Sequence, residues 1–244
     1  MFLFEVCANS VESAINAQTG GADRIELCAN LESGGTTPSY ASIKLCKEKL
    51  TIPINVLIRP RNGDFLYTDL EFQEIISDII LCKELGVSGI VCGFLNSNGT
   101  IDIERTKKIV ELTYPLSFTF HRAFDVSRNP FESLEDIISC GATRILTSGT
   151  SDKAINATEI LSKLILQANQ RIVIMPGSGI NENNIIELHS KTKAKEYHFS
   201  GSATHHSEME FQKNNIISTE KSDYSKTVSD VEKIRNTINK LKIL

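Results

Sequence analysis

The strongest constraint in the sequence is an alternation, repeated eight times, between a short apolar run and a longer amphipathic segment. The short runs have the length of strands, and the longer segments have the apolar spacing of helices. The predicted strands are Phe2–Cys7, Arg24–Cys28, Ile54–Arg59, Val87–Cys92, Leu116–His121, Arg144–Thr147, Arg171–Met175 and Glu196–Phe199. The predicted helices are Ser10–Thr19, Ser39–Lys49, Leu70–Leu85, Asp102–Leu112, Pro130–Cys140, Asp152–Ala168, Glu182–Ser190 and Ser229–Leu241.

Strands that alternate with helices form parallel sheets joined by crossover helices. Eight such units in 244 residues predict an α/β fold, a single (β/α)8 TIM barrel over residues 1–244 that is closed by a helix at 229–242. An open sheet with a helical C-terminal tail is the alternative architecture. Residues 200–228 are polar and too long for an ordinary connection. We therefore expect a long irregular, flexible loop after strand eight, either a flap over the barrel mouth or a disordered segment.

Composition and charge exclude several classes of function. The chain has 26 Lys and Arg against 30 Asp and Glu and contains no Trp, so we expect no nucleic-acid partner. No apolar run approaches the roughly 20 residues of a membrane span, and the first residues do not resemble a signal peptide. We expect a cytoplasmic protein without a membrane partner, whose six scattered cysteines are free thiols. Nothing indicates an organic cofactor, and a homo-oligomer is an open alternative.

Successive side chains on a strand face opposite ways, which predicts the residues that point into the barrel. Barrel interiors normally prefer branched apolar side chains, yet the predicted inward set is polar. It includes Glu5, Cys7, Glu26, Cys28, Arg59, His121 and His198. Buried charges need partners, so we expect Glu5, Glu26 and Arg59 of strands one to three to form an ion-paired cluster. This cluster either only holds the barrel together or belongs to a functional site at the carboxyl ends of the strands.

Two loops that follow strands carry candidate catalytic groups. After strand three, Arg59 and Arg61 flank a proline, which suits them to bind a carboxylate or a phosphate. After strand five, the run from His121 to Asp125 supplies a proton-transfer group, a cation and a carboxylate. Together with Glu26, these residues predict acid/base or lyase chemistry on a small anionic substrate, with Glu26 or His121 as the general base.

Glycines follow strands seven and eight, where barrels of this kind often bind phosphate through backbone amides. Gly177, Gly179 and Gly201 allow an anion to approach the backbone closely. They predict an anion-binding site, which would hold the phosphate group if the small anionic substrate is phosphorylated. The alternative is that these glycines only form tight turns.

Six segments of the chain resemble the CutC family, in order and with matching spacing up to about Ala203. They are Glu5–Cys7, Gly21–Cys28, Gly34–Ser39, Ile58–Phe65, Phe118–Asp125 and Arg144–Gly149. The chain departs from the family at Ser178, where a glycine or an alanine is usual. The resemblance implies a cytoplasmic TIM barrel named for copper homeostasis, with two cysteines proposed to bind Cu(I), carried here by Cys7 and Cys28.

Three classes of function therefore remain. The first is copper homeostasis through Cu(I) bound by Cys7 and Cys28, which are predicted to point inward from neighbouring strands. The second is a barrel enzyme that acts on a small anionic or phosphorylated ligand. The third is a scaffold or interaction protein, which predicts an empty mouth with fully neutralised charges.

Overall fold

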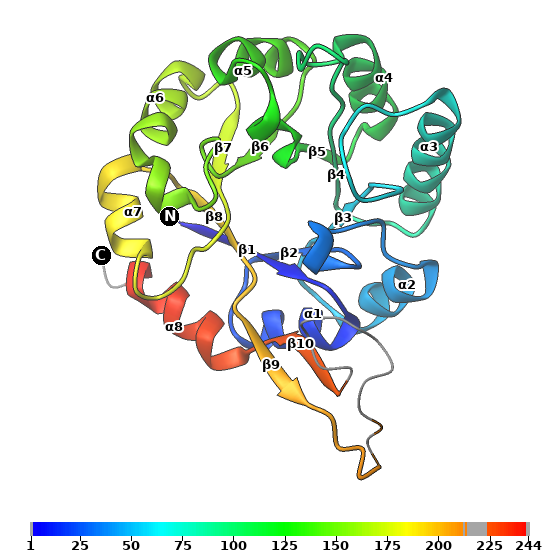
Figure 1. Ribbon diagram of the computed structural model, residues 1–244, viewed down its shortest axis with the longest axis vertical. Helices are drawn as coiled ribbons and strands as arrows, with labels where there is room; N and C mark the ends of the chain where they lie inside the picture. Colours follow the sequence, from blue (N-terminus) through cyan, green and yellow to red (C-terminus); the bar gives the residue numbers. More distant parts are fainter. Residues whose placement is uncertain (1, 212, 214–223, 243–244) are drawn as a thin grey trace.

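Eight parallel strands run around a barrel in chain order, inside a ring of helices (Figure 1). The computed structural model describes residues 2–211, 213 and 224–242. A single bridge between Gly177 and His198 joins the last two strands of the ring. The strands are β1 (Leu3–Ala8), β2 (Arg24–Leu27), β3 (Ile54–Leu57), β4 (Gly89–Cys92), β5 (Ser117–Phe120), β6 (Arg144–Thr147), β7 (Val173–Pro176) and β8 (Glu196–Phe199). The predicted (β/α)8 TIM barrel is confirmed.

Each barrel strand is followed by a helix, as the alternation predicts. The helices are α1 (Val11–Thr19), α2 (Tyr40–Lys49), α3 (Asp69–Glu84), α4 (Ile103–Thr113), α5 (Pro130–Ser139), α6 (Thr158–Ala168), α7 (Ile185–Thr192) and α8 (Val231–Lys242). Local signals set their starts. Thr68 and Glu71 form a capping box at α3, and Pro130 occupies the first turn of α5 after the cap of Asn129. None of the helices in the described part of the chain is long and apolar enough to cross a membrane.

The period-two prediction of side-chain direction is confirmed. Phe4, Val6 and Ile25 are fully buried in the apolar layer between the sheet and the helices. The alternate positions on the same strands, such as Glu5 and Glu26, are also buried but polar. The barrel interior therefore holds buried charges, which must find partners inside the protein or in a ligand.

The segment after β8 differs from the predicted irregular loop. Its two arms, β9 (Ser202–His206) and β10 (Ser225–Ser229), pair as an antiparallel sheet. Asn9 and Asn16 of the α1 region donate side-chain hydrogen bonds to the carbonyls of Thr227 and Ser229, at 3.0 and 2.9 Å. The arms project outward past α1 and α8 rather than across the mouth (Figure 1).

The sequence did not show this pairing because both faces of the arms are polar, so no apolar alternation marks them as strands. Positions 212 and 214–223 of the predicted flexible loop lie outside the described residues.

Candidate metal and ligand site at the barrel mouth

A cavity of about 440 Å³ opens at the carboxyl ends of the strands. This is the end at which barrels of this fold carry their chemistry. Its lining residues are Cys7, Asn9, Glu26, Leu31, Glu32, Gly34, Leu57, Arg59, Phe65, His121, Arg122, Leu146, Ser178, Gly179, Ile180, His198, Phe199, Ser200, Ser202 and Thr227.

Below the cavity lies a network, buried except for the partly exposed Glu196, that we call the ion-paired layer. It consists of Glu5, Arg24, Asn55, Thr119, Arg144 and Glu196. Arg24 donates to the carboxylate of Glu5 and, at 2.9 Å, to that of Glu196. Arg144 donates to the same Glu196 at 2.6 Å. The predicted pairing of Glu5 and Glu26 with Arg59 is wrong, because Arg24 lies directly opposite Glu5 in the register of β1 and β2.

The partners of Glu5 hold it in the charged form. Burial alone would raise the pKa of this carboxyl. A hydrogen bond from His198 and the positive charges of Arg24 and Arg144 outweigh that effect and lower the pKa to about 2. Arg144 and Glu196 were not selected from the sequence, although each begins a strand at an inward position.

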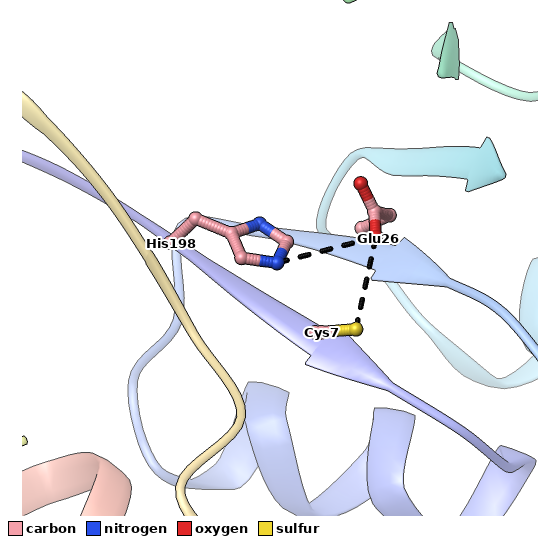
Figure 2. A group of neighbouring side chains, drawn as sticks. All are labelled: Cys7, Glu26 and His198. Atoms are coloured by element: carbon pink, nitrogen blue, oxygen red, sulfur yellow. Dashed lines mark hydrogen bonds and ion pairs between the residues drawn. The ribbon is translucent and has the colours of Figure 1, made fainter. Parts of the chain in front are cut away.

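Above this layer lies the mouth cluster, which we define as Cys7, Glu26, Cys28 and His198. The Cys7 Sγ lies 3.6 Å from the Cys28 Sγ and donates to Glu26 Oε1 at 3.7 Å. His198 Nε2 lies 4.0 Å from the same Glu26 oxygen, and Figure 2 shows the three side chains of Cys7, Glu26 and His198 turned toward one another. The sequence predicted that each of these four residues points into the barrel, and it paired the two cysteines, but it did not predict that Glu26 and His198 lie beside them.

The charges in the mouth cluster are less completely matched than those below it. Burial raises the pKa of Glu26 to about 7, against the opposing charge of His198. Burial would lower the pKa of His198, but Glu26 and Glu5 together raise it. Hydrogen bonding to Cys28, burial and the nearby carboxylates raise the pKa of the Cys7 thiol, so the thiol keeps its proton.

Arg59 lines the cavity, but its guanidinium donates hydrogen bonds to the loops around the cavity. Its Nη1 donates to the carbonyls of Ser33 and Gly35 at 3.0 and 2.8 Å, and its Nη2 donates to that of Gly63 at 2.7 Å. The guanidinium also stacks on the ring of Phe65, 5.0 Å from its centre. Arg59 therefore fixes two loops at the mouth.

His121 lies on the wall of the cavity and is buried. Its Nδ1 accepts a hydrogen bond from the backbone N–H of Ala123 at 3.2 Å. Burial and the charge of Arg59 lower the pKa of His121 to about 3, so the ring is neutral and Nε2 carries the proton. That Nε2 makes no hydrogen bond to the described residues. His121 is thus placed as a hydrogen-bond donor rather than as the general base that the sequence also allowed.

Asp125 and Arg61, two further predicted site residues, are not among the residues that line the cavity. Asp125 accepts hydrogen bonds from Thr147, from Ser148 and from Arg122, which joins the loops after β5 and β6. Arg61 pairs with Glu71 at 2.5 Å and with Asp64 at 3.1 Å. The Asp125 carboxylate and the Arg61 guanidinium are therefore both already paired within the protein.

Of the three glycines predicted to bind an anion, only one lines the cavity. Gly179 lines it, whereas the amide of Gly177 donates to the carbonyl of Thr147 at 2.9 Å. Gly201 packs so close to Ile234 that a Cβ would lie 2.6 Å from its side chain. Ser178 adopts a φ of 81°, the left-handed region that favours glycine, and its hydroxyl donates to the carbonyl of Asp152 at 2.6 Å.

The chain matches proteins of one family along most of its length. A profile described as the CutC family matches residues 2–203. A family protein CutC of Parabacteroides distasonis is 46% identical over 237 residues, covering 96% of this chain and 98% of that protein. The human copper homeostasis protein cutC homolog is 44% identical over 241 residues, covering 98% of this chain and 88% of that protein.

Solved structures agree with the fold. A crystal structure named for a copper homeostasis protein CutC of Streptococcus agalactiae aligns with a TM-score of 0.77 and 36% identity. It covers 82% of this chain and 99% of that chain. A phosphoribosylanthranilate isomerase of Thermotoga maritima aligns with a TM-score of 0.60 over the whole of both chains, but at 13% identity. That second similarity shows the shared barrel fold alone.

Proposed function

The chain belongs to the CutC family, and from this premise we propose that it serves copper homeostasis by binding Cu(I) through Cys7 and Cys28 in the cytoplasm. One observation carries the proposal. Two thiol sulfurs from neighbouring strands lie 3.6 Å apart in the buried mouth cluster. Cu(I) prefers soft sulfur ligands, and this pair offers two of them to one ion.

The donor pair passes a test of fit. The separation of the sulfurs is much longer than the roughly 2.05 Å of a disulfide, so both remain free thiols. Cys7 also lines the cavity, which gives an ion a route to the pair. Binding must displace the proton that Cys7 shares with Glu26, since thiolate is the form that ligates metals.

The test is Cu(I) binding in competition with a chromophoric chelator. We expect the Cys7→Ser, Cys28→Ser double variant to lose stoichiometric Cu(I) binding while it keeps the fold. The matched control is Cys46→Ala, which removes a buried thiol from α2 and should bind Cu(I) like the wild type. Undiminished Cu(I) binding by a folded double variant would refute the assignment.

A second candidate function is acid/base or lyase chemistry on a small anionic or phosphorylated substrate. It is favoured by two cavity-lining residues, Glu26 and His121, that each bury an atom without a hydrogen-bond partner among the described residues, Oε2 and Nε2. The expected roles are proton transfer by Glu26 and hydrogen-bond donation by His121. Glu26 is the better proton acceptor because Nδ1 of His121 is already engaged.

Calorimetry with inorganic phosphate tests this second candidate. Phosphate should bind the wild type, and His121→Phe should abolish binding. Arg61→Ala is the matched control, since Arg61 does not line the cavity and should be dispensable. The candidate fails if the wild type does not bind phosphate or if the His121→Phe variant binds it equally well. Loss of binding in Arg61→Ala would instead restore the anion-binding role that the sequence predicted for this residue.

A further inference from the structure

Three different metal-ligating atoms converge on the cavity wall. A Cys7 sulfur, a Glu26 carboxylate oxygen and a His198 ring nitrogen lie within 4.8 Å of one another, and all three residues are buried (Figure 2). They come from β1, β2 and β8, which are neighbours in the sheet. Mixed sulfur, nitrogen and oxygen donors suit a borderline divalent ion such as Zn²⁺.

Two of the three separations between these atoms approach those of a zinc site, and the third is within 4.8 Å. Tetrahedral Zn²⁺ with ordinary bond lengths sets its ligand atoms about 3.3–3.6 Å apart. Here Cys7 Sγ lies 3.7 Å from Glu26 Oε1, and His198 Nε2 lies 4.0 Å from the same oxygen. The sulfur–oxygen separation would have to shorten by about 0.2 Å and the nitrogen–oxygen separation by about 0.6 Å to reach those of a bound ion.

His198 is already oriented as a ligand. Its Nδ1 bonds to Glu5 Oε1 at 2.8 Å, which leaves Nε2 on the side of Glu26. Glu5 is itself held by Arg24 and by Asn55, whose Nδ2 donates at 2.9 Å. A carboxylate behind a ligating histidine fixes the ring and raises its basicity, as in many zinc sites.

A second observation is that the carboxylate beside these atoms is incompletely matched. Glu26 Oε2 is buried and has no hydrogen-bond partner among the described residues. In Figure 2 this oxygen points away from both Cys7 and His198. Leaving a buried carboxylate oxygen unmatched is costly, and a bound cation would neutralise the whole carboxylate.

We propose that Cys7, Glu26 and His198 form a Zn²⁺ site whose fourth coordination position opens into the cavity. All three residues line that cavity, so the side of the ion that they do not cover faces it. Three protein ligands with one open position are typical of catalytic rather than structural zinc. Cys7 loses its thiol proton when the ion binds. The proposed Zn²⁺ and Cu(I) sites share only Cys7. The other Zn²⁺ ligands are Glu26 and His198, whereas the other Cu(I) ligand is Cys28.

The two sites separate in a binding experiment on the full chain. Zn²⁺ affinity is measured against a chromophoric chelator, and Co²⁺ is added as a spectroscopic probe. We expect one Zn²⁺ per chain, and a thiolate-to-cobalt charge-transfer band in the wild type. His198→Gln and Glu26→Gln should each weaken Zn²⁺ binding by more than about 10-fold, and Cys7→Ser should remove the band. Cys46→Ala, which removes a buried thiol from α2, is the matched control and should keep both the Zn²⁺ affinity and the band. Cys28→Ser is measured beside it to test whether the thiol pair holds the ion.

The outcomes distinguish the two proposals. Loss of Cu(I) binding but not Zn²⁺ binding in Cys28→Ser supports two donor sets that share Cys7. Unchanged Zn²⁺ affinity in both His198→Gln and Glu26→Gln overturns the zinc site, whatever happens to copper. Loss of Zn²⁺ binding in Cys28→Ser also overturns it, since the ion would then be held by the thiol pair. Circular dichroism of each variant shows whether a loss reflects unfolding.

Discussion

Two layers of polar side chains fill this barrel, and they differ in how well their charges are matched. In the ion-paired layer, the carboxylates of Glu5 and Glu196 are paired with Arg24 or Arg144. In the mouth cluster, Glu26 reaches His198 only at 4.0 Å, and its Oε2 has no hydrogen-bond partner in the part of the chain that the structure describes. Glu5 and Glu26 are both buried, whereas 15% of the Glu196 side chain is exposed, so solvent does not explain why Glu5 is matched and Glu26 is not.

The contrast separates groups that stabilise the barrel from groups that await a ligand. A buried charge without a full set of partners destabilises the folded chain. The matched layer is explained by the fold alone. The mouth cluster is not, because Glu26 Oε2 belongs to an ionisable group and has no partner among the described residues, and a bound ligand would supply one. Asn55 Oδ1 of the ion-paired layer also lacks such a partner, but it belongs to a neutral amide. Removing a charge should therefore have opposite consequences in the two layers.

The largest expected effect comes from Glu5→Ala. This change leaves Arg24 and His198 without their shared carboxylate in a buried site. We expect the free energy of unfolding to fall by about 3–5 kcal/mol, as for other broken buried ion pairs. Urea denaturation monitored by circular dichroism measures it.

Glu26→Gln is the matched variant in the mouth cluster. It removes an incompletely matched charge and should leave stability within about 1 kcal/mol of the wild type at neutral pH, or raise it. Equal decreases in the free energy of unfolding of Glu5→Ala and Glu26→Gln would show that the two layers have the same role.

The pH dependence of stability should differ in sign between the two carboxylates. The pKa of Glu5 falls to about 2 on folding, so its contribution is present above about pH 4.5 and disappears as the pH drops toward 2. The pKa of Glu26 rises to about 7, so the folded chain loses stability as the pH rises from about 4.5 to about 7.

The size of this loss is on the order of 2–3 kcal/mol from the shift of Glu26. Urea unfolding at a series of pH values should show the decline in the wild type and a much weaker decline in Glu26→Gln. Parallel curves for the two proteins would show that Glu26 titrates as it does in the unfolded chain.

Much of the fold could be predicted from the sequence because the barrel strands carry a regular signal. Alternation of apolar and polar positions placed Phe4 outward and Glu5 inward, and the structure agrees. The β9–β10 arms lack that signal, since their stability comes from backbone pairing and from side chains of the α1 region such as Asn16.

Only some residues of the mouth were predicted from the sequence, since Arg61 and Asp125 do not line the cavity, and the pairings were not predicted. The alternation of side-chain direction along each strand predicted that Cys7, Glu26 and His198 point into the barrel. It gave no register between strands, so the partner of Glu5 was assigned to Arg59 instead of Arg24. Loop residues were harder still. The sequence does not show that Thr147 and Ser148 donate hydrogen bonds to the Asp125 carboxylate, because those contacts depend on the path of two loops.

Arg59 extends the comparison because it lies in the mouth and both its terminal nitrogens are matched, although its Nε has no hydrogen-bond partner among the described residues. Its two terminal nitrogens serve three carbonyls from two loops, a geometry that one ammonium group does not reproduce. Arg59→Lys should therefore lower the free energy of unfolding by about 2 kcal/mol while it keeps the charge. Urea denaturation checks the loss, and Cu(I) and Zn²⁺ titrations should match the wild type, since none of the proposed donor atoms belongs to Arg59. The opposite pattern, wild-type stability with weakened phosphate or metal binding, would make Arg59 a ligand-binding residue like the mouth cluster.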